Sequence, residues 1–214
     1  RQGNARLGPL NLEVTLATDG GSLRLDPLPA TQVEVEESGP LHAVVRLQGG
    51  LGHEGQAPSS LRYDLRFHAF AALPEFRMEL TLVNAAPRES EPLSIAAARL
   101  TLPLASPAAR RQFGGDRGAH QVDESAAARL VQADDLGYRV TSGDAEVASG
   151  TRALGWVAAQ IDPGWCVFAV RHFWQNHPKA LDTTPSHVGV DLWAGEQPFE
   201  WEGGLAKTHE VVVT

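Results

Sequence analysis

In Leu61-Arg62-Tyr63-Asp64-Leu65-Arg66-Phe67-His68-Ala69-Phe70, apolar side chains occupy the odd positions and polar side chains the even positions as far as His68. A period of two places alternate side chains on opposite faces of a β-strand, so this stretch predicts a strand with one buried face. Phe76-Arg77-Met78-Glu79-Leu80-Thr81-Leu82 repeats the pattern after a short link that contains Pro74. Together the two stretches predict an antiparallel hairpin.

Similar strand signals, separated by turn residues, recur along the chain. Further strands are predicted at 11–17, 22–26, 32–37, 41–48, 94–104, 128–132, 138–141, 155–161, 164–173, 187–193 and 206–213. About twelve short strands predict an all-β protein, an antiparallel β-sandwich with few or no helices, and periodicity leaves a barrel open as the alternative. Residues 105–127 carry no clear signal and are left open as a loop with one short helical turn. Because 164–173 is apolar on both faces, we expect a central strand that is covered on both sides.

Composition narrows the classes of function. The chain has 214 residues and a net charge of −8, with 18 basic and 26 acidic side chains. The acidic balance argues against a nucleic-acid partner, and the apolar runs are too short to cross a membrane. The one cysteine, Cys166, lies in an apolar run and is expected to be a buried, small hydrophobic residue. From the length and the strand signals we expect residues 1–214 to form a single β-sandwich domain.

The densest group of chemically versatile side chains follows the strand at 164–173. It reads Arg171-His172-Phe173-Trp174-Gln175-Asn176-His177-Pro178-Lys179. Arginine can bind a carboxylate with two hydrogen bonds, tryptophan offers a flat apolar face to a sugar ring, and amides bond to hydroxyls. This set suits a sugar acid. The alternative is structural, with Trp174 closing the end of the fold and the polar groups capping the backbone of the loop.

A second group lies near the end of the chain, at Trp201 to Glu210. On a strand, Lys207 and His209 share a face and lie about 6.5–7 Å apart. The chain has sixteen arginines but only two lysines, Lys179 and Lys207, one in each group. A lysine retained in an arginine-rich chain suggests chemistry that needs a compact ammonium or an amine that can lose its proton. We expect the two groups to meet at one rim of the fold.

A third candidate is the polar face of the hairpin, which carries Arg62, Asp64, Arg66 and His68 beside Arg77, Glu79 and Thr81. Opposite charges on neighbouring strands stabilise a sheet modestly, so a solvated face is favoured. A carbohydrate-binding face is the alternative.

Four stretches together resemble the rhamnogalacturonan exolyase family of polysaccharide lyases: 37–46, 171–181, 190–193 and 204–210. The most specific are Arg171-His172-Phe173-Trp174-Gln175-Asn176-His177-Pro178-Lys179-Ala180-Leu181 and Gly204-Leu205-Ala206-Lys207-Thr208-His209-Glu210. The resemblance covers nearly the whole chain and implies the central β-sandwich of a larger protein, which also has an N-terminal barrel and a C-terminal α/α toroid. It implies an extracellular or periplasmic protein that acts on acidic, uronate-containing polysaccharide by β-elimination, with this chain inactive alone.

Elimination at a uronic acid needs a cation to neutralise the carboxylate, a base to remove the neighbouring proton and an acid to protonate the leaving oxygen. From the chemistry of the side chains, the catalytic candidates are His172, Lys179, Lys207 and His209. The substrate-binding candidates are Arg171, Trp174, Gln175, Asn176 and His177. No metal ligands are assigned, although bound calcium would serve the carboxylate as well as Arg171. Two other classes stay open: a non-catalytic carbohydrate-binding module, and a structural module that assembles with copies of itself through exposed strand edges.

Overall fold

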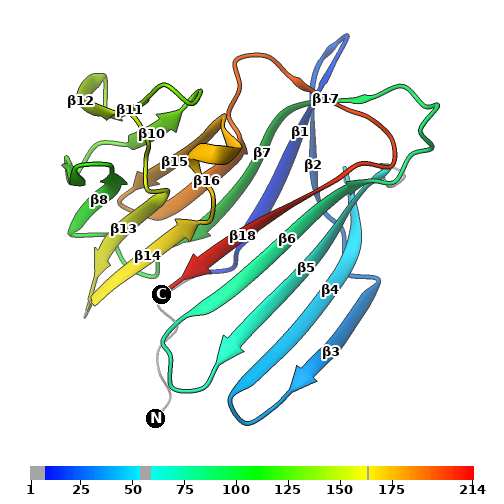
Figure 1. Ribbon diagram of the computed structural model, residues 1–214, viewed down its shortest axis with the longest axis horizontal. Helices are drawn as coiled ribbons and strands as arrows, with labels where there is room; N and C mark the ends of the chain where they lie inside the picture. Colours follow the sequence, from blue (N-terminus) through cyan, green and yellow to red (C-terminus); the bar gives the residue numbers. More distant parts are fainter. Residues whose placement is uncertain (1–7, 54–58, 163) are drawn as a thin grey trace. The chain divides into compact units, whose positions relative to one another are not determined.

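A computed structural model describes residues 8–53, 59–162 and 164–214, which form β-strands and one short 3-10 helix (Figure 1). The eighteen strands of these residues are Asn11–Thr18 (β1), Gly21–Pro27 (β2), Gln32–Ser38 (β3), His42–Gly52 (β4), Leu61–Phe70 (β5), Phe76–Asn84 (β6), Leu93–Pro103 (β7), Arg110–Gly115 (β8), Gly118–Val122 (β9), Ala128–Gln132 (β10), Tyr138–Ser142 (β11), Ala145–Gly150 (β12), Trp156–Ile161 (β13), Gly164–Val170 (β14), Lys179–Thr184 (β15), His187–Trp193 (β16), Phe199–Trp201 (β17) and Ala206–Val213 (β18). The 3-10 helix is Trp174–Asn176 (η1). The predicted all-β, antiparallel class is confirmed, with more strands than the sequence indicated.

The strands fall into two compact units. Unit 2 comprises residues 12–98 and 195–213, and unit 1 comprises 99–194 together with short terminal segments. This division does not test the prediction that the chain is a single domain of a longer protein. In the described part of the chain, no helix is long and apolar enough to cross a membrane.

Unit 2 is built on a five-stranded antiparallel sheet in the order β3-β4-β5-β6-β18 (Figure 1). The alternation that predicted the β5–β6 hairpin separates the two faces of this sheet. Met78, Leu80 and Leu82 are buried on one face. The register places Gln48 opposite Asp64 and Asp64 opposite Thr81 on the other, polar face.

Strand β3 lies at the edge of this sheet and pairs with β4 alone among the described strands. All seven of its residues are exposed, and Val33 and Val35 are 64% and 62% exposed. The register of the β3–β4 pair shifts between Val35 and Glu37. A bulge of this kind and a row of glutamates are devices by which proteins protect an open strand edge.

Unit 1 contains two antiparallel sheets, β9-β8-β13-β14 and β12-β11-β10-β15-β16. Buried side chains such as Phe113, Phe168 and Leu181 form its core. The fully buried Arg111 of β8 connects the two sheets, because its guanidinium donates a hydrogen bond of 2.9 Å to the carbonyl of Thr183 in β15.

Two expectations need correction in unit 1. Residues 105–127, left open as a loop with a helical turn, contain the β8–β9 hairpin. The segment 164–173 is a strand only as far as Val170, and within unit 1 it is covered on one face. Its outer face carries Trp165, which is 39% exposed and lines an open hollow. Both faces of this strand are apolar, as predicted, but among the described residues of unit 1 no element packs against its outer face.

Candidate functional site

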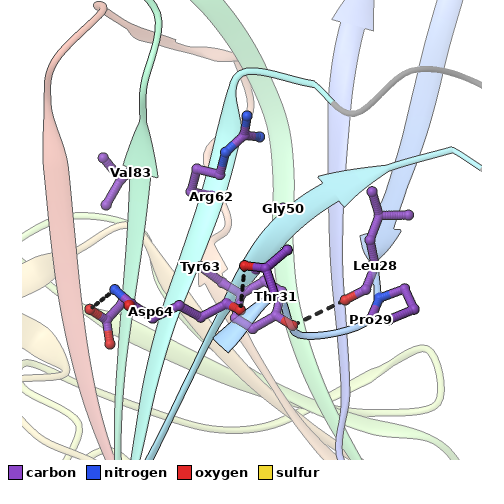
Figure 2. A pocket seen from close by; sticks show the side chains of 10 residues that line it. Leu28, Pro29, Thr31, Gly50, Arg62, Tyr63, Asp64 and Val83 are labelled. Carbon is purple, nitrogen blue, oxygen red and sulfur yellow. Dashed lines mark hydrogen bonds between the residues drawn. The ribbon is translucent and has the colours of Figure 1, made fainter. Parts of the chain in front are cut away.

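An open pocket of about 420 Å³ lies in unit 2, where the connection between β2 and β3 runs along the edge of β4 (Figure 2). Its described lining residues are Leu28, Pro29, Thr31, Gln48, Gly49, Gly50, Arg62, Tyr63, Asp64 and Val83. The connection supplies one wall, and β4, β5 and β6 supply the others. The pocket therefore adjoins the hairpin face that the sequence offered as the third candidate.

Hydrogen bonds to β4 hold the connecting segment in place. The amides of Leu28 and Thr31 donate to the carbonyls of Gly50 and Gln48 at 3.0 and 2.8 Å. The Thr31 hydroxyl donates to the same Gln48 carbonyl at 3.2 Å. The Tyr63 hydroxyl donates to the carbonyl of Leu28 at 3.0 Å, as Figure 2 shows. This wall is thus tied to the sheet by backbone and side-chain bonds.

Glycine at position 49 makes the Tyr63 contact possible. A Cβ atom at Gly49 would lie 2.5 Å from the Tyr63 hydroxyl oxygen, closer than any real contact allows. A glycine within a strand often marks such a close approach. Burial raises the pKa of Tyr63, so its phenol stays protonated and remains a hydrogen-bond donor.

The carboxylate of Asp64 is held by three neighbours on the polar face. Arg46 Nε donates to it at 2.9 Å and a second nitrogen of Arg46 also contacts it, while Gln48 Nε2 donates at 2.9 Å. Arg66 approaches at 3.4 Å and also pairs with Glu36 at 2.8 Å. The hydrogen bond from Arg46 lowers the pKa of Asp64. Asp64 is therefore an ionised acceptor at neutral pH and is unsuited to act as a general acid.

Arg62 supplies the positive end of the pocket. Its side chain is exposed, and its Nη1 donates to the carbonyls of Ser59 and Leu61 at 2.5 and 3.3 Å. In Figure 2 its guanidinium points away from the carboxylate of Asp64. The described lining residues include no histidine, lysine or cysteine. The pocket thus offers the Arg62 cation, the two oxygens of the Asp64 carboxylate as hydrogen-bond acceptors, and apolar surface. These groups suit binding better than proton transfer.

The remainder of the hairpin face is a network of charges and rings. His42 stacks on His68, with 3.2 Å between His42 Nε2 and His68 Nδ1, and His42 also contacts Glu37 at 3.0 Å. Burial and the neighbouring Arg77 lower the pKa of His68. These mutual pairings are typical of the solvated face favoured from the sequence. We therefore consider the carbohydrate-binding alternative only for the part of the hairpin face that lines the pocket.

The first predicted group, 171–179, lies in unit 1 and makes mostly local contacts. Trp174 packs beneath the Arg152 guanidinium, which lies 4.4 Å from its ring centroid. Asn176 Nδ2 donates to the His172 carbonyl at 3.1 Å, and His177 Nδ1 lies 3.1 Å from the Trp174 carbonyl. These contacts fit the structural alternative, in which the polar groups cap the loop backbone.

Exposure differs sharply among the members of this group. The side chains of Arg171, His172, Gln175 and His177 are exposed, whereas Lys179 is 0% exposed. Lys179 begins β15 instead of lying in the loop, and its ammonium donates to the Leu192 carbonyl at 3.0 Å. The sequence analysis made Lys179 and Lys207 equal candidates for catalysis, but the side chain of Lys179 is buried inside unit 1.

The second predicted group, 201–210, lies in unit 2. Lys207 and His209 occupy alternate positions of β18, as predicted, yet Lys207 is exposed while His209 is only 7% exposed. Since the two predicted groups belong to different units, the expectation that they meet at one rim stays a prediction. The described residues contain no cluster of three or more histidine, cysteine or acidic side chains suited to a metal ion. The calcium alternative also stays untested.

Sequence reasoning missed most of the pocket. It named Arg62 and Asp64 as part of the hairpin face but not Thr31, Gln48 or Tyr63. The available signal was the pair Gly49-Gly50 directly after the strand predicted at 41–48, since glycines at a strand can mark close backbone approach.

Residues 29–123 match the family described as PcRGLX-like protein central beta sandwich domain. The resemblance predicted from the sequence is confirmed over this segment. It contains every described lining residue of the pocket except Leu28, whereas the groups at 171–179 and 201–210 lie outside it. A comparison with curated protein sequences gives no match.

Two solved structures show a distant likeness. One is a putative aldose 1-epimerase from Klebsiella pneumoniae subsp. pneumoniae MGH 78578, with 10% identity and a TM-score of 0.47 over 94% of this chain and 59% of that one. The other is a putative aldose 1-epimerase from Escherichia coli K12, with 9% identity and a TM-score of 0.45 over 93% of this chain and 77% of that one. This chain thus spans less than two thirds of the first structure, and neither likeness indicates its function.

Proposed function

We propose that this chain is the carbohydrate-binding β domain of a polysaccharide lyase-like protein that acts on uronate-containing polysaccharide by β-elimination. The observation that carries the proposal is the pocket of unit 2, which lies almost entirely within the segment that matches the central sandwich family. The match supports the type of parent protein, and the pocket supports the acidic sugar as the ligand.

The side chains of the pocket fit the parts of a uronate. Arg62 is an exposed cation that would bind the carboxylate. Asp64 and Gln48, already oriented by their mutual hydrogen bond, would accept from and donate to ring hydroxyls. Leu28, Pro29 and Val83 offer apolar surface to the carbon face of the ring. A pocket of about 420 Å³ lies in the range of small-molecule sites.

In this proposal the pocket supplies binding, and proton transfer comes from elsewhere. Neutralising the uronate carboxylate makes the neighbouring proton more acidic, which Arg62 can assist but cannot complete without a base. His172 and Lys207 are exposed and are our candidates for the base in the full-length protein. The N-terminal barrel and C-terminal toroid of the parent would complete the cleft, and such a substrate places the protein outside the cell or in the periplasm.

A binding experiment on the chain tests the pocket. Isothermal titration with trigalacturonate should show binding that is lost with the carboxyl-reduced, neutral trisaccharide. Hydrogen bonds to charged groups contribute about 1.5–3 kcal/mol, so Arg62→Gln should weaken binding by about tenfold or more. The matched control is Arg139→Gln, an exposed arginine of β11 in unit 1 that should bind as the wild type does. Equal affinities for the Arg62 variant and the wild type would exclude this pocket.

A second experiment tests the reaction. The full-length protein should release unsaturated products from acidic polysaccharide, followed by their ultraviolet absorbance. Arg62→Gln should raise KM, whereas His172→Ala or Lys207→Ala should lower kcat if that residue is the base. Full-length protein that binds trigalacturonate without releasing unsaturated product would support the binding module alone and refute the lyase.

The second candidate is a structural module that assembles with copies of itself. The exposed β3 edge favours it, because unpaired backbone groups on an edge strand can pair with another chain. Sedimentation of the chain over a range of concentrations separates the candidates, since a carbohydrate-binding module stays monomeric and an assembling module does not.

A further inference from the structure

The outer face of the β9-β8-β13-β14 sheet in unit 1 carries an open, largely apolar hollow of about 320 Å³. It is lined by Gln112, Trp156, Ala158, Trp165, Val167 and Ala169. The register accounts for this grouping, because Gln112 lies opposite Ala158, and Ala158 lies opposite Val167. The opposite faces of these strands bury Phe113, Val157 and Phe168. The hollow is therefore on the side away from the core of unit 1.

One of the two indoles lies directly on the backbone of the neighbouring strand. A Cβ atom at Gly114 would come within 2.2 Å of Trp156 Nε1 and 2.3 Å of Cε2. Only glycine leaves room for the ring there, so Trp156 lies along the sheet instead of standing upright on it. A ring that lies flat turns one aromatic face outward.

Trp165 extends this surface along the strands. It lies opposite Gln160, four residues beyond Trp156 on β13, so the backbone positions of the two tryptophans are about 13 Å apart along the strand direction. Ala158 and Val167 lie opposite each other between these two positions and form the floor of the hollow there. The spacing exceeds one pyranose ring, so the surface fits a short chain of rings.

Polar groups lie at the Trp165 end of the surface. A second hollow of about 720 Å³ is lined in part by Ser106, Arg110, Gln160 and Asp162. Within the described residues, no hydrogen bond or ion pair engages the side chains of Gln112, Arg110 or Gln160. Because Arg110 and Asp162 carry opposite charges, the hollow is close to neutral overall and offers both donors and acceptors to hydroxyl groups.

We propose that this face, with Trp156 and Trp165 as its aromatic platforms, is a binding surface for a neutral oligosaccharide. The carbon faces of pyranose rings would pack on the indoles, and ring hydroxyls would bond to Gln112, Gln160 and Arg110. An extended lipid chain would leave those three polar groups unsatisfied, and the net charge of −8 disfavours nucleic acid. The surface is separate from the acidic-sugar pocket of unit 2 and does not depend on it.

The test titrates the chain with three neutral hexasaccharides, β-1,4-galactohexaose, cellohexaose and xylohexaose, followed by calorimetry and tryptophan fluorescence. At least one should bind and perturb the fluorescence. Truncating a tryptophan that the bound partner buries commonly costs a factor of ten or more in affinity. Trp165→Ala should therefore weaken binding by about tenfold or more. Trp165→Phe, which keeps a smaller ring, should lie between Trp165→Ala and the wild type. Circular dichroism confirms that the variants are folded.

Cross-controls separate this surface from the pocket of unit 2. Arg62→Gln should bind the neutral hexasaccharide as the wild type does, and Trp165→Ala should keep its affinity for trigalacturonate. The proposal is overturned if none of the three hexasaccharides binds or if Trp165→Ala binds unchanged. It is also overturned if the chain is a dimer that Trp165→Ala converts to a monomer, because the face would then be a contact between copies of the chain.

Discussion

Replacing Arg111 with methionine should destabilise unit 1 strongly. The side chain is fully buried, and its guanidinium donates to three carbonyls: Thr183 at 2.9 Å, Ala126 at 2.7 Å and Asp123. Methionine fills similar space but donates to none of them. Burial lowers the pKa of Arg111, and the nearby carboxylates of Asp123 and Glu124 counteract part of this effect.

The magnitude follows from these contacts. The buried Thr183 carbonyl costs about 1–3 kcal/mol when it is left without a donor, whereas each lost bond to the more accessible carbonyls of Asp123 and Ala126 costs about 0.5–1.5 kcal/mol, which gives about 2–6 kcal/mol for three. Removing a buried charge recovers part of that cost, so we expect a net loss of about 2–4 kcal/mol. For a chain of this size the midpoint of thermal unfolding should fall by about 2–4 °C for each kcal/mol. Arg111→Lys, which keeps the charge but not the planar fork, should fall between methionine and the wild type.

Urea unfolding followed by circular dichroism measures the effect. Arg110→Met is the matched control, because Arg110 precedes Arg111 on β8 and is exposed. It should change the free energy of unfolding by no more than about 0.5 kcal/mol. If Arg111→Met lies within about 1 kcal/mol of the wild type, the three carbonyls do not depend on the guanidinium and the reasoning is refuted.

Three further predictions concern single side chains. Gly49→Ala places a methyl group 2.5 Å from the Tyr63 hydroxyl, so it should cost about 1–3 kcal/mol in urea unfolding and weaken trigalacturonate binding, whereas unchanged values would show that the wall can relax. Hydrogen bonds from Thr151 hold the pKa of Asp116 at about 2, below the ordinary 3.8. The stability from Asp116 is therefore present above pH 4 and lost as the pH falls toward 2, and Asp116→Asn should flatten that part of the stability profile in acid titrations monitored by circular dichroism. Burial raises the pKa of Cys166 to about 11, so a thiol reagent at pH 8 should label it only after unfolding, and rapid labelling of the native chain would contradict its burial.

The β5–β6 hairpin could be predicted because the residues that determine it are close together in the sequence. Alternation from Leu61 to His68 and from Phe76 to Leu82 requires no knowledge of distant residues, and both strands form in the expected register of faces. The same reasoning found Arg62 and Asp64. The wall opposite them could not be found, because it depends on long-range hydrogen bonds that Leu28 and Thr31 make to β4.

The β8–β9 hairpin was missed for a different reason. Gly114 and Gly115 make the segment resemble a loop, yet each glycine is needed in a strand. A Cβ atom at Gly115 would lie 2.1 Å from His120 Nε2 and 2.2 Å from the Tyr138 hydroxyl oxygen. Strand propensity is low for glycine, but the packing of neighbouring rings overrides it here.

Lys179 shows the limit of reading chemistry from residue type. A lysine beside histidines and amides suggested a reactive amine, and nothing local indicates that the side chain turns inward. Its burial depends on the Leu192 carbonyl, which β16 brings across the sheet from β15. By contrast, Lys207 is exposed because it lies near the start of β18, where the sheet ends.

The rim strand β3 has a consequence for handling the protein in acid. Glu34, Glu36 and Glu37 give its unpaired side a negative charge, and the hydrogen bond from Arg66 lowers the pKa of Glu36. Two molecules that approach each other through their β3 edges at neutral pH therefore repel each other. Protonation of these glutamates removes that repulsion, while Val33 and Val35 stay exposed. We therefore expect acid to convert the protected β3 edge into a template for fibril growth.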